Sequence, residues 1–177
     1  MLTLRGMETA DLDLVAAWLD EPEVARWFLI ASTIEEEIEG LRRCLVGGEP
    51  TEVLLVIDRD EPIGWCQWYF CREYPEHGEG VGAGPDDIGI DYAIGEPTRR
   101  GGGVGTALIA ELVSYIRRRH RHAGIIADPE ASNVASRRVL EKNGFTLLEV
   151  RPVASEPTQA PMAIYRLRPE PGPGVAG

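Results

Sequence analysis

The amino-acid sequence predicts a mixed α/β domain in which a central sheet is covered by helices. Two observations lead to this fold class. Some segments repeat apolar residues at helical spacing and others are short β-branched runs, in the order strand, helices, three strands, helix, strand, helix, two strands. The 177 residues and 44% hydrophobic content also suit one domain with one core. We therefore expect one domain over residues 1–168 and a flexible Pro/Gly tail over 169–177.

The N-terminal part is expected to form one short strand and three helices. Thr9 and Pro22 are typical of helix starts, and Thr33 with Glu36 three positions later makes a capping-box pattern. The glycine pair at 47–48 ends the third helix. The expected ranges are 2–5 for the strand and 9–19, 22–27 and 33–47 for the helices.

The rest of the chain is expected to add six strands and two helices. A turn at 59–62 joins the first two of these strands into a hairpin. Residues 71–86 are rich in Gly, Pro and Glu and are expected to form a long functional or mobile loop. The expected strands are 53–57, 63–70, 87–94, 124–128, 145–150 and 162–167, and the expected helices are 103–120 and 132–142.

The composition restricts where the protein works and what it binds. Its net charge of −11 disfavours nucleic acid or an anionic membrane as the main partner. The sequence shows neither a signal-peptide-like N-terminus nor an apolar run near the roughly 20 residues that a membrane span needs, so we expect a cytoplasmic protein. The three cysteines are expected to be free thiols, and without a histidine cluster beside them we expect no metal site.

Acidic residues are concentrated between 73 and 91, a stretch without Lys or Arg. The segment has two interpretations: a solvated acidic loop, or a surface that attracts a cationic substrate. The acids are Glu73, Glu76, Glu79, Asp86, Asp87 and Asp91.

A glycine-rich loop precedes the clearest helix of the chain. Glycines let the backbone turn sharply, and free N–H groups at a helix start favour an anion such as a pyrophosphate. The alternative is a turn that only connects strand to helix. No Gly-Lys-Ser/Thr follows, which excludes a P-loop, and the loop lies too late in the chain for a Rossmann fingerprint. Its residues are Arg99, Arg100, Gly101, Gly102, Gly103, Val104, Gly105 and Thr106.

The pattern Arg100-x-x-Gly103-x-Gly105, with the segment 133–145, resembles the two acyl-CoA-binding motifs of the GNAT acetyltransferase superfamily. The resemblance implies a GNAT-like, mostly antiparallel sheet with helices on both faces, and acetyl-CoA as cofactor. It implies that the loop 100–106 holds the pyrophosphate and that Asn133 and Ser136 line the thiol end. The pantetheine would pair with the backbone of Ala93, Ile94 and Gly95.

Transfer of an acetyl group to an amine requires a base, because only the neutral amine attacks. Asp91 is the best candidate, since it lies within a probable central strand, on the face opposite the large apolar residues. The alternative is a salt-bridged structural aspartate. Many family members carry a tyrosine where this chain has Leu140, so that acid is absent. Ser136 is a candidate replacement, and a water molecule is the alternative.

Several stretches resemble aminoglycoside 6′-N-acetyltransferases more specifically, which implies a small cationic amine substrate and a role in antibiotic resistance. Examples are Glu61-Pro62-Ile63-Gly64-Trp65 and Gly89-Ile90-Asp91. Other readings stay open: a peptide or ribosomal-protein N-terminus, a siderophore precursor, or a non-catalytic acetyl-CoA sensor. The protein could be a monomer or homodimer. The residues expected toward the acceptor are Trp27, Gln67, Asp87, Asp91 and Asp128.

Overall fold

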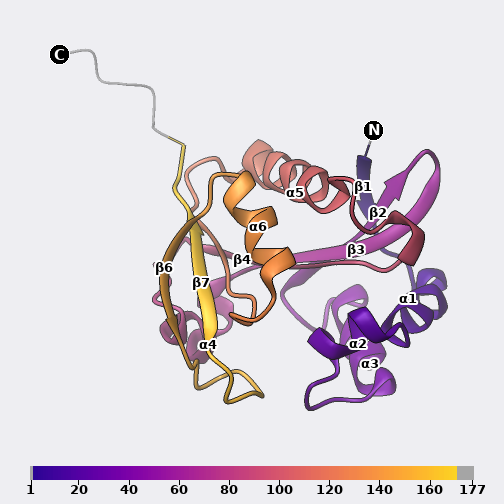
Figure 1. Cartoon of the computed structure of the whole chain (residues 1–177), viewed down its shortest axis with the longest axis horizontal. Helices are drawn as coiled ribbons and strands as arrows, with labels where there is room; N and C mark the ends of the chain where they lie inside the picture. The colour runs from indigo at the N-terminus through magenta and orange to yellow at the C-terminus, as the bar shows by residue number, and fades with distance from the viewer. Residues whose placement is uncertain (1, 171–177) are drawn as a thin grey trace.

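The computed structural model describes residues 2–170 as one seven-stranded sheet with helices on both faces (Figure 1). The strand order is β1-β2-β3-β4-β5-β7-β6. Only β4 and β5 run parallel, and the other neighbours are antiparallel, which confirms the predicted fold class. The strands are β1 (Leu2–Gly6), β2 (Thr51–Asp58), β3 (Glu61–Phe70), β4 (Ile88–Ile94), β5 (Ile125–Ala127), β6 (Thr146–Arg151) and β7 (Met162–Leu167).

The helices begin close to the residues that the sequence indicated. At α3, the Thr33 hydroxyl accepts from the Glu36 N–H and the Glu36 carboxylate accepts from the Thr33 N–H, so the predicted capping box is present. The predicted first helix is divided into a 3₁₀ turn and α1. The bounds are η1 (Thr9–Asp11), α1 (Leu12–Leu19), α2 (Pro22–Phe28), α3 (Ile34–Leu45), η2 (Cys71–Glu73), α4 (Pro75–Gly80), η3 (Pro97–Arg99), α5 (Val104–His120) and α6 (Val134–Lys142).

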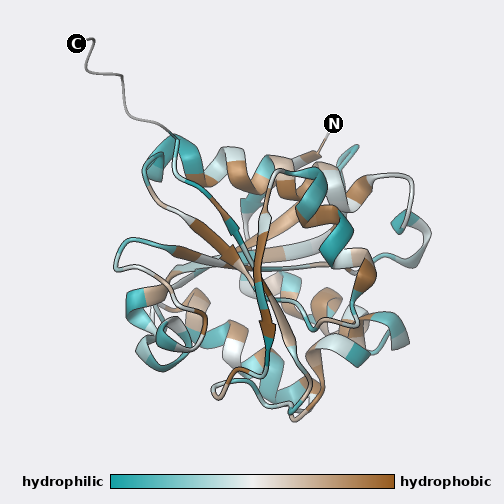
Figure 2. Cartoon of the chain, turned by 60° about the vertical axis from the view of Figure 1, so that its left-hand side comes forward, coloured by the Kyte–Doolittle hydropathy of each residue, from teal (hydrophilic) through white to brown (hydrophobic). Residues whose placement is uncertain are grey.

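The sheet separates two apolar cores, and Figure 1 shows α1–α3 on one side and α5 and α6 on the other. The α5 side buries Leu108, Leu112 and Ile116 against β-branched residues of the central strands. The other side buries Leu12, Val15 and other α1 residues against β2 and β3. Figure 2 shows hydrophobic stretches along the strands that cross the middle of the molecule, with hydrophilic residues between them. Burial on both faces fixes the sheet rigidly beneath the site.

The segment 71–86 is not the predicted long loop, because it contains η2 and α4. Pro75 takes the first helical turn, where its missing N–H costs nothing. The helix packs closely: a Cβ added at Gly78 would lie 2.9 Å from the Cys71 carbonyl oxygen. Its glycines and acids leave no apolar stripe, so the helical period could not be read from the sequence. The helix places His77 at the site described below.

The parallel pair β4 and β5 is short, and this opens a gap in the sheet. Pairing is limited to Ile88 with Ile125 and Gly89 with Ile126. Beyond Gly89, β4 continues to Ile94 without a paired strand on its β5 side, while its other edge stays paired with β3. The Ile88 N–H donates to the Gly124 carbonyl on the β5 side. By alternation, the backbone groups of Ile90 and Tyr92 point into the gap.

The predicted tail begins as an anchored segment. The Glu170 N–H donates to the Arg121 carbonyl oxygen, and the Glu170 carboxylate lies 3.3 Å from the Arg121 guanidinium. The remaining tail residues, 171–177, lie outside the described residues. Within residues 2–170, the structure holds no helix with the length and apolar character of a membrane span. The three cysteines are free, as predicted, and burial raises the pKa of Cys71 to about 12.

Candidate active site

A cavity of about 590 Å³ lies at the gap between β4 and β5. Six of the predicted site residues meet in its lining: Trp27, Gln67, Asp91, Asp128, Asn133 and Ser136. The ionisable lining is mostly acidic, with six carboxylates against one arginine and one histidine. These residues are Glu37, Glu49, Asp91, Asp128, Glu130, Glu156, Arg43 and His77. Such a surface favours a cationic ligand.

Asp91 lies on β4 directly opposite Gln67 on β3. The Gln67 side-chain amide donates to the Asp91 carboxylate over 2.9 Å. Burial, helped by the negative charge of Asp128, raises the pKa of Asp91 to about 6, while the bond from Gln67 favours the charged form and opposes the shift. A carboxylate with this pKa is ionised at neutral pH yet basic enough to accept a proton from an amine.

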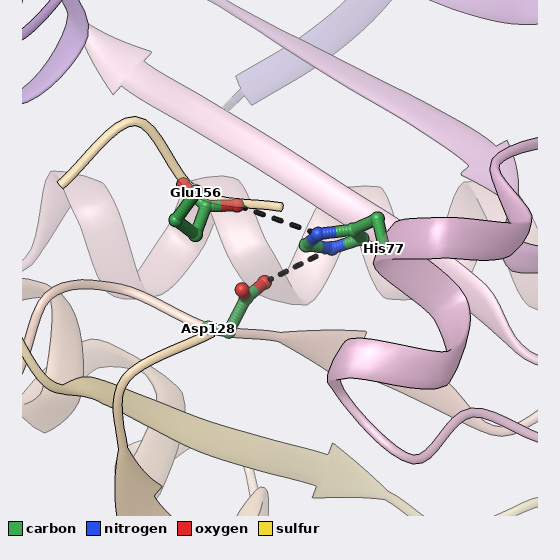
Figure 3. A group of neighbouring side chains, drawn as sticks. All are labelled: His77, Asp128 and Glu156. Carbon is green, nitrogen blue, oxygen red and sulfur yellow. Dashed lines mark ion pairs between the residues drawn. The ribbon is translucent and has the colours of Figure 1, made fainter. Parts of the chain in front are cut away.

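Three residues from distant segments form a second charged group in the cavity: His77, Asp128 and Glu156 (Figure 3). The His77 Nε2 lies 3.6 Å from an Asp128 oxygen, and its Nδ1 lies 3.3 Å from a Glu156 oxygen. The bonds to these two carboxylates raise the pKa of His77 to about 10. The ring is therefore an imidazolium at neutral pH, bridging the two acids.

The same three residues offer metal-ligating atoms within 4.8 Å of one another. Their geometry favours the ion pair, because each ring nitrogen faces a different carboxylate and a metal needs one nitrogen and both acids at a common point. The predicted lack of a metal stays a prediction. Sequence reasoning missed His77 and Glu156, which α4 and the β6–β7 connection bring to the site.

Asp128 also has an oxygen that no described residue pairs. Its Oδ2 is buried and makes no hydrogen bond, while Oδ1 faces His77. Burial raises the pKa of this carboxyl, and the bond from His77 opposes the shift. A buried polar atom without a partner is costly, so Oδ2 is suited to accept from a ligand donor.

One wall of the cavity is aromatic. Trp65 stacks on Trp18 with ring centroids 6.1 Å apart and packs against Phe28 at 5.2 Å. Trp27 lines the cavity nearby, and its ring lies 4.5 Å from the Arg26 guanidinium carbon. Aromatic faces beside acidic groups can contact both the apolar edges and the cationic groups of a ligand.

Asp87 does not contact the cavity, contrary to the prediction. Its side chain is almost fully buried, pairs with Arg166 at 2.8 Å and accepts from the Gly84 N–H at 2.7 Å. Other acids of the 73–91 segment are also paired elsewhere, since Glu73 and Asp86 lie beside Arg72. Sequence spacing could not show this, because Arg166 is remote in the chain. Of the six acids in this segment only Asp91 lines the cavity, and the other carboxylates of the lining come from elsewhere in the chain: Glu37, Glu49, Asp128, Glu130 and Glu156.

The predicted anion loop leads into α5 as expected. Gly101, Gly102 and Gly103 have φ angles of 81°, 56° and 85°, a region that disfavours side chains. A Cβ at any of the three would meet nothing within 4 Å, so the loop has open space beside it. The 17-residue helix that follows directs its free N–H groups and its positive dipole end toward this space. These features fit a pyrophosphate.

The two loop arginines are occupied by protein partners. The Arg100 guanidinium donates to the carbonyl oxygens of Ile94 and Gly95, at 3.1 and 2.7 Å. Arg99 pairs with Asp58 and Glu61 at 3.1 and 3.2 Å. Arg100 thus braces the loop against the end of β4, and the backbone N–H groups of the loop remain as the candidate groups for holding an anion. Ala93, whose backbone was predicted to pair with the pantetheine, is a partner of Trp65 in the register of β3 and β4.

Asn133 and Ser136 meet at the start of α6. The Asn133 side chain accepts from the Ser136 N–H at 3.1 Å and so caps the helix. The Ser136 hydroxyl lies 2.6 Å from the hydroxyl of Tyr92, a cavity residue that sequence reasoning did not select. The alternation of β4, which put Asp91 on one face, was the available signal that Tyr92 faces α6.

Comparisons with known proteins identify the family of this chain. A family model described as an acetyltransferase (GNAT) domain matches residues 8–151. Aminoglycoside N(6′)-acetyltransferases type 1 from Klebsiella pneumoniae and Serratia marcescens are each 28% identical over 152 residues, which covers 81% of this chain and 73% of each relative.

Solved structures share the fold. The aminoglycoside acetyltransferase AAC(6′)-Ib in complex with coenzyme A and kanamycin has a TM-score of 0.77 at 24% identity, with 95% of both chains covered. An aminoglycoside N(6′)-acetyltransferase from Legionella pneumophila has a TM-score of 0.73 at 19% identity, covering 94% of this chain and 91% of that one. An uncharacterized protein from Bacillus halodurans has a TM-score of 0.81 at 17% identity, covering 94% and 83%.

Proposed function

Because this chain belongs to the GNAT acetyltransferase family and is an acyl-CoA-dependent N-acetyltransferase, we propose that its acceptor is a small polycationic amine, an aminoglycoside acetylated at its 6′ amine. The observation that carries this proposal is the acidic cavity at the gap beside β4. It brings a half-buried carboxylate, Asp91, together with a separate acidic pair, Asp128 and Glu156. A substrate with several ammonium groups can use both.

Acetyl-CoA is the acyl donor, and it supplies a thioester carbonyl for the amine to attack. The residues of the chain suit it at two places. The open backbone of loop 101–103 and the N-terminus of α5 fit the pyrophosphate. The unpaired edge of β4 offers the Ile90 and Tyr92 backbone groups to an extended amide chain, as an added strand would use them.

Asp91 then serves as the base in this proposal. Its pKa of about 6 leaves it ionised at neutral pH, and Gln67 holds one oxygen so that the other stays available. It removes a proton from the ammonium, directly or through a water, so that the neutral nitrogen can attack. The burial that raises its pKa also makes it a stronger base than an exposed aspartate.

The His77–Asp128–Glu156 group acts as the second anchor. The imidazolium holds the two carboxylates in place and neutralises one of their charges, so the three together carry a single negative charge when both acids are ionised. The unpaired Asp128 oxygen accepts from a second ammonium or hydroxyl of the acceptor. The names of the relatives support an aminoglycoside as this acceptor.

A thiol-detection assay tests the proposal. The wild-type protein is incubated with acetyl-CoA and, in turn, kanamycin, spermidine and a peptide with a free N-terminus, and the released CoA is quantified. We expect turnover with kanamycin, and NMR of the product should show acetylation at the 6′ nitrogen. Turnover only with the peptide would overturn the acceptor. Clear acetyl-CoA binding without turnover on any amine would favour a non-catalytic sensor.

A further inference from the structure

Two hydroxyl groups meet on the α6 side of the gap. The Tyr92 hydroxyl lies 2.6 Å from the Ser136 hydroxyl and 3.4 Å from the Ser136 carbonyl oxygen. Tyr92 comes from β4 and Ser136 from the first turn of α6, and both line the cavity. Leu140, one helical turn after Ser136 on the same face, is fully buried and apolar. The two hydroxyls of Tyr92 and Ser136 are therefore the polar groups that line the cavity where β4 meets α6.

Asp91 and Tyr92 approach the gap from opposite faces of the sheet. Consecutive strand residues point to opposite faces, and the packing agrees: Asp91 bonds to Gln67, whereas Tyr92 packs against the α5–α6 core. At these positions β4 has no paired strand on its β5 side, so the cavity reaches both faces. An acyl group in the gap would receive its amine from the Asp91 side and release its sulfur toward the Tyr92 side.

We propose that the Tyr92 hydroxyl, positioned by Ser136, donates the hydrogen bond that stabilises the sulfur as it leaves the acetyl group. This inference rests on the acetyl transfer proposed above. When the Ser136 hydroxyl donates to the Tyr92 oxygen, the Tyr92 hydroxyl keeps one protein acceptor, the Ser136 carbonyl oxygen at 3.4 Å. That bond is long for a hydroxyl donor, so a sulfur in the cavity can take its place as the acceptor. Tyr92 is then a catalytic residue, and Ser136 is a positioning residue that acts through it.

Acetyl transfer takes two protons from the amine nitrogen and returns one to the sulfur. Asp91 removes one proton from the ammonium, and the neutral nitrogen bonds to the acetyl carbon. The carbon–sulfur bond breaks, its electron pair stays on sulfur, and the nitrogen loses its second proton to water. The departing thiolate, stabilised by the Tyr92 hydroxyl, takes a proton from water. One proton in net is released to solvent.

The properties of Tyr92 suit a hydrogen-bond donor. Burial raises its pKa to about 12, above the value of about 8.5 for an ordinary thiol, so the hydroxyl stays protonated beside a thiolate. Hydrogen bonds to charged groups are stronger than those between neutral groups. The bond therefore gains strength as charge develops on sulfur, which is the condition for lowering a barrier.

The test is the pKa of the CoA thiol when CoA is bound. It is obtained by titrating the thiolate absorbance of the complex against that of the ligand-free protein, without any acceptor. We expect Tyr92→Phe to raise the bound thiol pKa by about one to two units relative to wild type. Ser136→Ala should raise it by less. Tyr115→Phe, which removes a hydroxyl on α5 outside the cavity, is the matched control and should leave it unchanged.

The kinetic counterpart is a fall in kcat of about 10- to 100-fold for Tyr92→Phe, with little change in the KM for acetyl-CoA. An unchanged bound thiol pKa in Tyr92→Phe would overturn the inference. If that variant fails to fold or to bind CoA, the same titration is made with 3-fluorotyrosine at position 92. This residue keeps the hydroxyl and makes it a stronger hydrogen-bond donor. The bound thiol pKa should then fall below the wild-type value, and no change would also overturn the inference. Because no acceptor is used, this result is independent of which amine is acetylated.

Discussion

The side-chain amide of Gln67 donates to the carboxylate of Asp91 across the β3–β4 pair, at 2.9 Å. The two residues are direct partners in the strand register, so the bond follows from the sheet itself and not from a mobile loop. It leaves the other Asp91 oxygen for the acceptor and stabilises the ionised carboxylate that burial opposes. The proposed role of Asp91 as a base therefore depends on a contact between two neighbouring strands.

The first prediction concerns pH. A base must be unprotonated, so kcat/KM should rise with pH and level off above the Asp91 pKa of about 6. Replacing Gln67 with Leu removes a bond that favours the charged form, so the inflection should move to higher pH. Steady-state rates across a pH series measure the inflection of kcat/KM for the wild type and for Gln67→Leu. An inflection in Gln67→Leu at or below the wild-type value would exclude the assigned role of the amide.

The second prediction concerns His77 and stability. Its pKa is raised from 6.5 to about 10 in the folded protein, so the folded state keeps a proton that the unfolded chain loses in that range. The stabilisation is complete below pH 6.5 and disappears as pH rises toward 10. Chemical denaturation should show the stability advantage of wild type over His77→Gln shrinking across this window. A difference that does not vary with pH would contradict the charged bridge.

The third prediction distinguishes Asp87 from Asp128, two aspartates that the sequence analysis both placed toward the acceptor. Asp87→Asn weakens the pair with Arg166 and should lower the free energy of unfolding by about 1–3 kcal/mol, with the KM for the acceptor unchanged. Asp128→Asn removes a cavity charge and should raise the KM for a polycationic acceptor roughly tenfold or more. Denaturation curves and acceptor titrations on both variants measure this. A raised KM in Asp87→Asn would place that residue at the acceptor after all.

The fourth prediction concerns the anion loop. Gly103 has a φ of 85°, where a β-branched residue is strained, so Gly103→Val should disturb the backbone N–H groups and weaken acetyl-CoA binding about tenfold or more. Gly47→Val is the matched control, because Gly47 has a φ of 77° in the turn after α3, with equally open surroundings. Calorimetry should find near-normal affinity in the control. Equal affinities in both variants would refute the loop assignment.

Much of the fold could be predicted because local signals were strong. The capping box of α3, the hairpin of β2 and β3 and the glycine-rich start of α5 each depend on residues close in sequence. The helix α4 was missed because its six residues carry no apolar stripe. Where a short helix lacks such a stripe, contacts decide its formation, and these are not visible in the sequence.

A site residue could be predicted where a single segment of the sequence indicates its position. It was harder to predict where its position depends on contacts between several segments. Asp91 followed from the alternation of a single strand, and Asn133 from the resemblance of the segment 133–145 to a cofactor-binding motif. His77, Glu156 and the Tyr92–Ser136 pair depend on segments that meet only after folding. Asp87 was assigned to the acceptor because its partner, Arg166, lies 79 positions away. Contacts between residues far apart in the sequence were the missing information in each case.

The most direct test of the central claim compares CoA release by wild type and Asp91→Asn with kanamycin and acetyl-CoA. The substitution keeps the size of the side chain and removes the base, so kcat should fall roughly 100-fold or more. Acetyl-CoA affinity and thermal stability, measured on the same samples, should stay near wild type. A variant that turns over at close to the wild-type rate would contradict the claim that Asp91 is the base of this acetyltransferase.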